Sequence, residues 1–443
     1  SYSTAYDAAL LPGAAVGAAY EQVWSIYEQH SEQLKSIDDH DDSIYKDSKA
    51  LRERLFALLR AEQYTAAQEL AEDAMAYGAA EDMLRYLHTY AIERQGDLPR
   101  AMALAEAYLK TGSNALRHEF MRLRAAVAYR MGDVRAAEYY RCAYEEEPSD
   151  PALYSSFLLA KNAQDVDDEE LFRAHCAYGE LLAHVPQYTY RKSYAHPKIR
   201  VGYISPDFRR NVLQHFVQPF LTMYDHTRFA VYVYSTAEQP DEVTAGLRPH
   251  ADQWREMGGR TAEEIAAQIH ADEVDILVDL AGHAAGGALP VLARRPAPVQ
   301  MMGLGYMATS GLSAVDYMIG DVWLDGAPAG MRNAPFFTEK LLALLHTHLC
   351  YTPAADAPPP GALPCLARGF VTFGSFNAFA KASASGMGAD SRSRACVAAA
   401  LKVRRFFERR GVRRCACTSA SGGRRCCARR AAPRYTRISA GVP

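Results

Sequence analysis

The chain of 443 residues is long enough for about three domains, and its 49% hydrophobic and 23% charged residues are typical of a soluble globular protein. It contains no run of the ~18 to 20 apolar residues that a membrane-spanning helix needs. No basic residue precedes the apolar stretch at 8–19, as a secretory signal would require. We therefore exclude a transmembrane helix and expect a cytoplasmic protein.

The formal net charge of −3 is divided unevenly along the chain. Residues 382–443 hold 14 Arg and one Lys against Asp390 and Glu408, a balance of +13, so residues 1–381 carry −16. Five of the nine cysteines also lie in this basic tail. The other four show no CxxC pair and are expected to be reduced thiols, namely Cys142, Cys176, Cys350 and Cys365.

Residues 51–150 are predicted to form helical repeats, after a less regular segment 1–50 whose acidic run at 38–42 is expected to be solvated. A Gly-Asp turn followed by an amphipathic stretch begins at Gly96 and again at Gly132, 36 residues later. This spacing is close to the ~34-residue tetratricopeptide period, and Pro148 stands where a Pro usually closes the repeat. The run at 63–78 resembles the second helix of an earlier copy. The alternative is an ordinary helical bundle.

From residue 198 the pattern changes to strands that alternate with helices, which is typical of βαβ units around a parallel sheet. A helix is predicted to start at Thr261, because Thr261 and Glu264 have the spacing of a capping box. A Pro-rich linker follows at 352–368, and 369–381 begins with what we interpret as the first strand of a second sheet. The strands of the first sheet are predicted at 198–205, 229–235, 274–283, 297–306, 316–324 and 339–344.

Ligands of such sheets bind at the carboxyl ends of the strands, so the polar residues there are candidate site residues. The imidazoles of His215, His270 and His283 are candidate proton acceptors. Small residues after the fourth predicted strand would let the backbone approach a ligand closely. The other candidates, in chain order, are Asp207, Asn211, Gly305, Tyr306, Thr309, Ser310 and Gly311.

The segment at 303–308 also fits the dinucleotide fingerprint GxGxxA, with Asp325 about 20 residues further on. That fingerprint must open a helix directly after a strand. Only six or seven residues separate Thr309 from the next predicted strand, so NAD binding is a disfavoured alternative.

Eight ordered blocks resemble the bacterial SPINDLY-type O-linked N-acetylglucosamine transferases, over roughly residues 84–381. The segment DDEELFRAH (167–175) is also similar to the helical connector that these proteins place between repeats and catalytic domain. The blocks are KIRVGYISPDFRR (198–210), DILVDLAGH (275–283), ARRPAPVQ (293–300), LGYMATSG (304–311), VDYMIGD (315–321), EKLLAL (339–344), CYTP (350–353) and FVTFGSFNAFAK (370–381).

The resemblance implies a GT-B enzyme whose two Rossmann-like domains face one cleft. It implies inverting transfer of GlcNAc from UDP-GlcNAc to Ser or Thr hydroxyls of acceptor proteins that the repeats hold, without a metal or another cofactor. Neither nucleic acid nor membrane is an expected partner, whereas a homo-oligomer is compatible with the repeats. The implied division is an N-terminal segment 1–50, repeats 51–150, a helical connector 151–197, an acceptor-side Rossmann-like domain 198–351, a linker 352–368, the first donor-domain strand 369–381 and the tail 382–443.

This sequence departs from the family pattern in two segments before residue 381. Asn211 stands where the family usually has a His after its first strand, and an asparagine can orient a hydroxyl but cannot accept its proton. Met307 and Ala308 replace a common Pro-Gly pair in a loop, which we interpret as variation.

The tail at 382–443 does not continue the family's donor-binding domain, so we find no donor-binding residues in this chain. We expect an out-of-frame translation of a GC-rich gene; the alternative is a genuine basic appendage that binds nucleic acid or metal. Its cysteine spacing lacks the paired CxxC of a zinc site. The chain as given is therefore expected to be inactive. Two alternatives are a non-catalytic binding module and a GT-B relative that uses another sugar or acceptor.

Overall fold

The computed structural model describes residues 48–366 except 80, 165, 191–193, 327–332, 355–356, 360 and 365. All described residues belong to one compact unit. The predictions for residues 1–47, for the strand at 369–381 and for the basic tail lie outside the described residues. None of the described helices is long and apolar enough to span a membrane.

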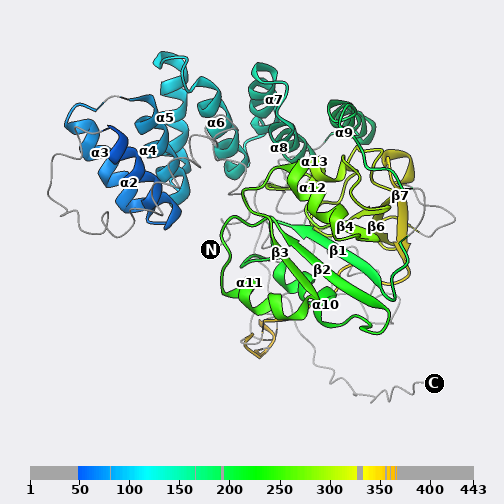
Figure 1. The fold of residues 1–443 in the computed structure, drawn as a ribbon. Helices are drawn as coiled ribbons and strands as arrows, with labels where there is room; N and C mark the ends of the chain where they lie inside the picture. The colour runs from blue at the N-terminus through cyan, green and yellow to red at the C-terminus, as the bar shows by residue number, and fades with distance from the viewer. Residues whose placement is uncertain are drawn as a thin grey trace, which may run out of the picture. The chain divides into compact units, whose positions relative to one another are not determined.

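The N-terminal part is a succession of antiparallel helices in which each helix packs against the next (Figure 1). The prediction of a helical-repeat region is confirmed. In chain order the helices are α2 (Ser48–Arg60), α3 (Tyr64–Ala76), α4 (Asp82–Gln95), α5 (Leu98–Thr111), α6 (Arg117–Met131), α7 (Ala136–Glu146), α8 (Pro151–Asn162) and α9 (Asp168–Leu181).

The two predicted Gly-Asp turns end α4 and α6. Gly96 has a φ of 92° and Gly132 a φ of 71°, the left-handed conformation that glycine adopts without strain at the end of a helix. Asp97 then accepts a hydrogen bond from the backbone N–H of Arg100 and caps α5. The 36-residue spacing in the sequence therefore marks a structural repeat of helix, turn and helix.

Seven described strands form one sheet in the order β3-β2-β1-β4-β5-β6-β7, and every neighbouring pair is parallel. This confirms the predicted doubly wound α/β domain. The short edge strand β3 was not predicted, because QWRE has no run of buried residues. The strands are β1 (Ile199–Ser205), β2 (Phe229–Ser235), β3 (Gln253–Glu256), β4 (Ile276–Asp279), β5 (Val299–Met302), β6 (Tyr317–Asp321) and β7 (Lys340–Leu344).

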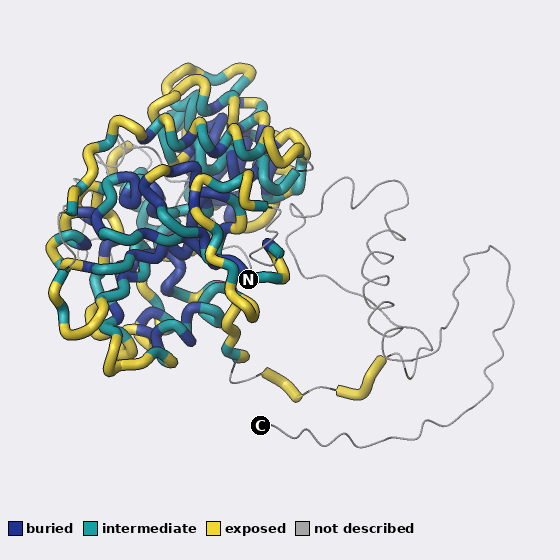
Figure 2. Tube along the Cα trace, turned by 90° about the vertical axis from the view of Figure 1, so that its right-hand side faces the viewer, coloured by how far each residue is buried: buried dark blue, intermediate teal, exposed yellow. Residues whose placement is uncertain are grey.

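Helices cover both faces of the sheet, and successive strand residues point to opposite faces. Val231 and Val233 of β2 join a core with α10 and α11, whereas Tyr234 joins a second core with α12 and α13. Figure 2 shows the buried residues inside this layered domain. The helices are α10 (Gln214–Thr222), α11 (Glu242–Leu247), α12 (Ala262–Ala271) and α13 (Leu289–Leu292), with 3-10 turns at Arg248–His250 and Ala334–Phe336. The predicted capping box of Thr261 and Glu264 starts α12.

Helix α9 joins the repeats to the sheet through a contact between two backbones. A Cβ atom added at Gly179 would lie 2.0 Å from the carbonyl oxygen of Gly311, in the loop that follows β5. A Cβ added at Gly311 would lie 1.9 Å from the carbonyl oxygen of His175, and Gly311 has a φ of +76°. Tyr178 and Leu158 are fully buried in the same core as α12 and α13. The last repeat helices are therefore part of the core of the α/β domain.

We predict that Gly179→Ala destabilises the chain by about 1 to 3 kcal/mol, because the new methyl group would overlap backbone that cannot rotate away. In an unobstructed helix the same change would stabilise by up to about 1 kcal/mol. Gly246 in α11 has no atom near the added Cβ, so Gly246→Ala is the matched control. Thermal unfolding of both variants checks this; equal midpoints for Gly179→Ala and wild type would contradict it.

Candidate active site at the carboxyl edge of the sheet

The strand order reverses between β1 and β4, and in sheets of this kind ligands bind at the carboxyl ends of the strands beside such a reversal. Two carboxyl groups lie there. Asp279 is the last residue of β4 and is fully buried, and Asp207 follows β1 and is only 5% exposed. Sequence analysis had selected Asp207 but not Asp279. The structure thus gives this edge a pair of buried acids.

The Asp279 carboxyl is held inside the domain at a cost in electrostatic free energy. Its Oδ2 accepts a hydrogen bond of 2.5 Å from the backbone N–H of Gly282, and its Oδ1 is buried without a partner among the described residues. Burial raises the pKa of Asp279 to about 7, opposed by backbone N–H donors and increased by the nearby charge of Asp207. The group therefore changes charge near neutral pH.

Asp207 is tied to Asn211, the residue at the position where a His was expected. The Asn211 Nδ2 donates to Asp207 Oδ1 at 2.7 Å, and the Asn211 Oδ1 accepts from the backbone N–H of Leu213 at 2.7 Å, just before α10. Burial raises the pKa of Asp207 to about 6, and the charge of Arg209 partly offsets this. Asn211 therefore orients the Asp207 carboxyl while its other end supports the start of α10.

His215 lies on α10 close to this edge and contacts the segment that leads out of the domain. Its Nδ1 donates to the carbonyl oxygen of Thr352 at 3.1 Å, and the Thr352 N–H donates to the His215 carbonyl at 2.7 Å. The ring of Tyr351 lies 5.8 Å from the imidazole. The side chain thus anchors residues 351–352 beside α10.

The His283 side chain packs against the repeat helices α8 and α9. Its Nε2 lies 3.0 Å from the carbonyl oxygen of Ser310, which can only accept, so Nε2 carries the proton and Nδ1 accepts from the Ser155 hydroxyl at 2.9 Å. Burial lowers the pKa of His283 well below its usual value. A neutral imidazole with both nitrogens bonded joins α8 to the loop after β5.

Another hydrogen bond between the repeats and the α/β domain joins α9 to the loop after β5. His175 Nδ1 donates to the Leu171 carbonyl at 2.7 Å, and its Nε2 accepts from the Tyr306 hydroxyl at 2.8 Å. Burial lowers the pKa of His175 to about 4. His175 was not among the sequence candidates, because a single His on a helix carries no signal of its contact 131 residues away.

The loop after β5 is held by hydrogen bonds to Glu339, and its residues Thr309 and Ser310 are buried. The Glu339 carboxylate accepts from the Thr309 hydroxyl at 2.7 Å and from the Ser310 N–H at 2.8 Å. A Cβ at Gly305 would lie 2.3 Å from the Leu280 carbonyl oxygen, so glycine is needed for packing against the end of β4. No helix follows β5 before β6, which excludes the dinucleotide fingerprint at 303–308.

His270 is not brought together with the other candidates. It lies in the last turn of α12, and since α12 leads into β4 this turn is at the amino edge of the sheet. Its ring stacks on Tyr188 with centroids 4.0 Å apart, and its Nδ1 lies 3.3 Å from the Tyr190 hydroxyl.

A carboxylate and imidazole pair that sequence analysis missed lies at the end of β6. Asp321 accepts from His348 Nδ1 at 2.6 Å and from the backbone N–H groups of His348, Trp323 and Leu324, and the backbone donor of His348 is the main cause of its lowered pKa. The Nε2 of His348 is buried without a partner among the described residues. The predicted strand at 316–324 ran past Asp321, so the carboxylate was not recognised as a strand end. Within the described part of the chain, no three His, Cys, Asp or Glu side chains are grouped as metal ligands.

Comparison with known proteins finds matches among glycosyltransferases. Residues 174–352, from α9 past β7, match the family model described as Glycosyl transferase family 41. The "Probable UDP-N-acetylglucosamine--peptide N-acetylglucosaminyltransferase SPINDLY" of Arabidopsis thaliana is 39% identical over 232 residues, 51% of this chain and 25% of that protein. The "UDP-N-acetylglucosamine--peptide N-acetylglucosaminyltransferase" of Caenorhabditis elegans is 32% identical over 156 residues, 34% of this chain and 13% of that protein.

A solved structure supports the same assignment over a longer range. A mutant of the Thermobaculum terrenum O-GlcNAc transferase superposes with a TM-score of 0.67 at 25% identity, over 78% of this chain and 65% of that chain. Helical repeats followed by a doubly wound α/β domain are thus the architecture that this chain shares with an O-GlcNAc transferase of known structure. Residues 174–352 match glycosyltransferase family 41, and the matched relatives and the solved structure carry O-GlcNAc transferase names. The match spans about a quarter of the length of the Arabidopsis relative.

We predict that Tyr306→Phe lowers stability by about 1 to 2 kcal/mol, because it leaves the buried Nε2 of His175 without its donor. The matched control is Tyr224→Phe, which removes an exposed bond to Asp252. Thermal unfolding should show a larger loss for Tyr306→Phe; the same loss in both variants would contradict the assigned bond.

Asp279→Asn is expected to stabilise the chain at pH 8 by about 4 kcal/mol and to have little effect near pH 4. The pKa of Asp279 is raised from 3.8 to about 7, so its burial reduces stability as pH rises through this window, fully above pH 7. Asparagine stays neutral throughout. Unfolding midpoints measured across pH check this, with the exposed Asp225→Asn as control. A gain that does not depend on pH would contradict the assignment.

Proposed function

We propose that this protein takes part in the inverting transfer of GlcNAc from UDP-GlcNAc to Ser or Thr hydroxyls of polypeptides, with the described α/β domain as the acceptor-side half. The observation that supports this most directly is the match from α9 past β7 to relatives that carry this activity in their names. The repeats, continuous with the same core through α9, would hold the acceptor polypeptide.

We assign the proton transfer of this reaction to Asn211 and Asp207. An acceptor hydroxyl must lose its proton as it attacks the anomeric carbon, and a general base is most effective with a pKa near the working pH. Asn211 has no basic group but contacts a carboxyl whose pKa is about 6. In this proposal Asp207 accepts the proton, and Asn211 holds the Asp207 carboxyl in place.

His215 would act as a positioning residue for the second half of the cleft. It is hydrogen-bonded to both the carbonyl and the backbone N–H of Thr352, at the start of the Pro-rich linker. His283 would hold the repeats to the α/β domain through its hydrogen bond with Ser155. His270, at the opposite edge of the sheet, would not contact the substrate.

The leaving UDP needs cationic and N–H groups around its developing negative charge. In this family these groups belong to the second domain, to which residues 382–443 have no resemblance. We therefore propose that residues 1–443 do not bind UDP by themselves.

Isothermal titration of the 443-residue chain with UDP should give no binding heat. The α/β domain must be shown to be folded in the same sample by a cooperative thermal transition. Saturable binding in the micromolar range would contradict the proposed absence of a donor site.

Transfer itself is tested with labelled UDP-GlcNAc on a chain in which the sequence after residue 381 is replaced by the translation of the gene's other frame. We expect label on Ser or Thr of a polypeptide acceptor, and at least about a hundredfold loss with Asp207→Asn, the size of a general-base contribution. Asp225→Asn is the control. Absence of product on every polypeptide tested would count against the enzyme and for the binding module.

A further inference from the structure

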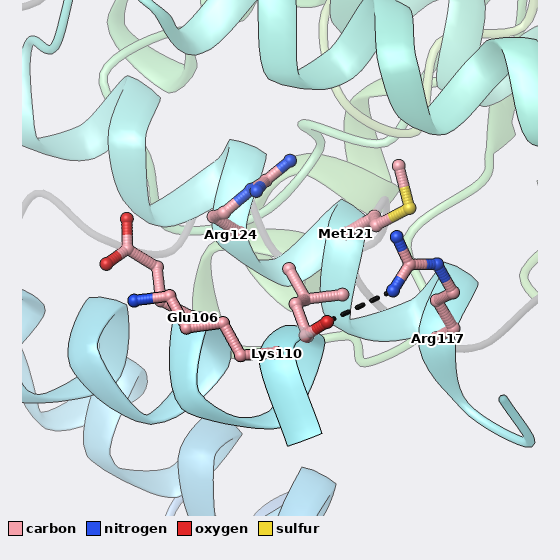
Figure 3. A pocket seen from close by; sticks show the side chains of 6 residues that line it. Glu106, Lys110, Arg117, Met121 and Arg124 are labelled. Atoms are coloured by element: carbon pink, nitrogen blue, oxygen red, sulfur yellow. Dashed lines mark hydrogen bonds between the residues drawn. The ribbon is translucent and has the colours of Figure 1, made fainter. Parts of the chain in front are cut away.

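A groove of about 250 Å³ lies between α5 and α6, outside the α/β domain. Figure 3 shows its side chains, which come from both helices. It is lined by Glu106, Leu109, Lys110, Arg117, Met121 and Arg124.

The groove is cationic within a region that is acidic. Residues 51–150 contain 17 acidic and 13 basic side chains. The groove reverses this balance, with three cations against the single carboxylate of Glu106. A positive site in a negative surface attracts a negative ligand to one place, and the surrounding charge repels anions elsewhere.

The three cations of the groove differ in the hydrogen bonds and ion pairs that they already form. Arg117 donates to the Leu109 carbonyl at 3.1 Å and lies 3.5 Å from a carboxylate oxygen of Glu146. Lys110 and Arg124 form no ion pair with any described residue. Two of the three positive charges are therefore available to a ligand.

Arg124 is held in place for such a role. Its guanidinium carbon lies 4.1 Å from the ring centroid of Tyr139, a cation–π contact that fixes the planar group. Its Nε is buried and has no hydrogen-bond partner among the described residues. A buried donor without a partner costs about 1 to 3 kcal/mol, which an incoming acceptor group can recover.

We propose that the groove between α5 and α6 binds an acidic polypeptide segment, with a carboxylate between Lys110 and Arg124. A guanidinium and an ammonium group both bind carboxylates through charge-assisted hydrogen bonds. Leu109 and Met121 offer apolar surface to the methylene groups of the same side chain. A groove of this volume holds a side chain or two and not a folded domain. The acidic surroundings disfavour a nucleic acid backbone, which needs a long positive track.

This binding does not depend on the proposed transfer reaction, and its test uses no activity. A fluorescein-labelled peptide, Gly-Ser-Asp-Glu-Asp-Glu-Asp-Ser-Gly, is titrated with the full 443-residue chain, and fluorescence anisotropy is measured. The matched peptide has Asn and Gln in place of Asp and Glu. We expect saturable binding of the acidic peptide, weaker at high ionic strength because salt screens the charges. The amide peptide should bind at least about tenfold more weakly.

The variant Lys110→Gln/Arg124→Gln should lower the affinity for the acidic peptide about tenfold or more. The control Lys49→Gln/Arg52→Gln removes the same two charges from α2, outside the groove, and should lower it less than about twofold. Because Arg124 is partly buried, the single variant Lys110→Gln at an exposed position is measured as well, and should lose about threefold without a change in unfolding midpoint.

Three results would overturn the proposal. They are the absence of saturable binding of the acidic peptide, equal binding of the acidic and the amide peptide, and equal losses in the groove variant and in the α2 variant. The last result would show an attraction to overall charge and not to this groove.

Discussion

The structure depends on the close approach of α9 to the loop after β5, where two glycines let backbone touch backbone. Because no side chain separates Gly179 from Gly311, the helix lies deep enough for His175 and Tyr178 to be buried beneath that loop. The hydrogen bonds from the Tyr306 hydroxyl to His175 and from the Ser155 hydroxyl to His283 become possible only at this depth. Each uses one defined tautomer of a neutral imidazole, so the repeats and the sheet share one core and one relative orientation.

The carboxyl edge of the sheet follows a second constraint, which is the reversal of strand order between β1 and β4. The connections leave this point in opposite directions, so the ends of the two strands are not covered by a common crossover. Asp207 and Asp279 lie there in surroundings that disfavour their charge. Keeping two such carboxyls buried reduces stability at neutral pH, which is characteristic of groups retained for chemistry.

Much of the fold could be predicted from local patterns in the sequence. The Gly-Asp turns, the capping box at Thr261 and the apolar strands all have short-range signatures, and the six strands expected between residues 198 and 344 are present. The edge strand β3 was missed because it is short and half exposed on both faces. The partners of the histidines could not be predicted, since the bond from His283 to Ser155 spans 128 residues and the one from His175 to Tyr306 spans 131. Asp279 was not selected for a different reason, because the predicted strand at 274–283 ran past the residue at which β4 ends.

The placement of the junction between repeats and sheet has a consequence for how such proteins diverge. Among the described repeat helices, α8 and α9 contribute residues to the core of the α/β domain, whereas the helices before them belong to a separate core. In an array with nearest-neighbour contacts, helix pairs can be added or lost at the free end without disturbing the rest. Because the two cores are separate, a change in the number of the earlier helices would leave the packing of α8 and α9 on the sheet unchanged.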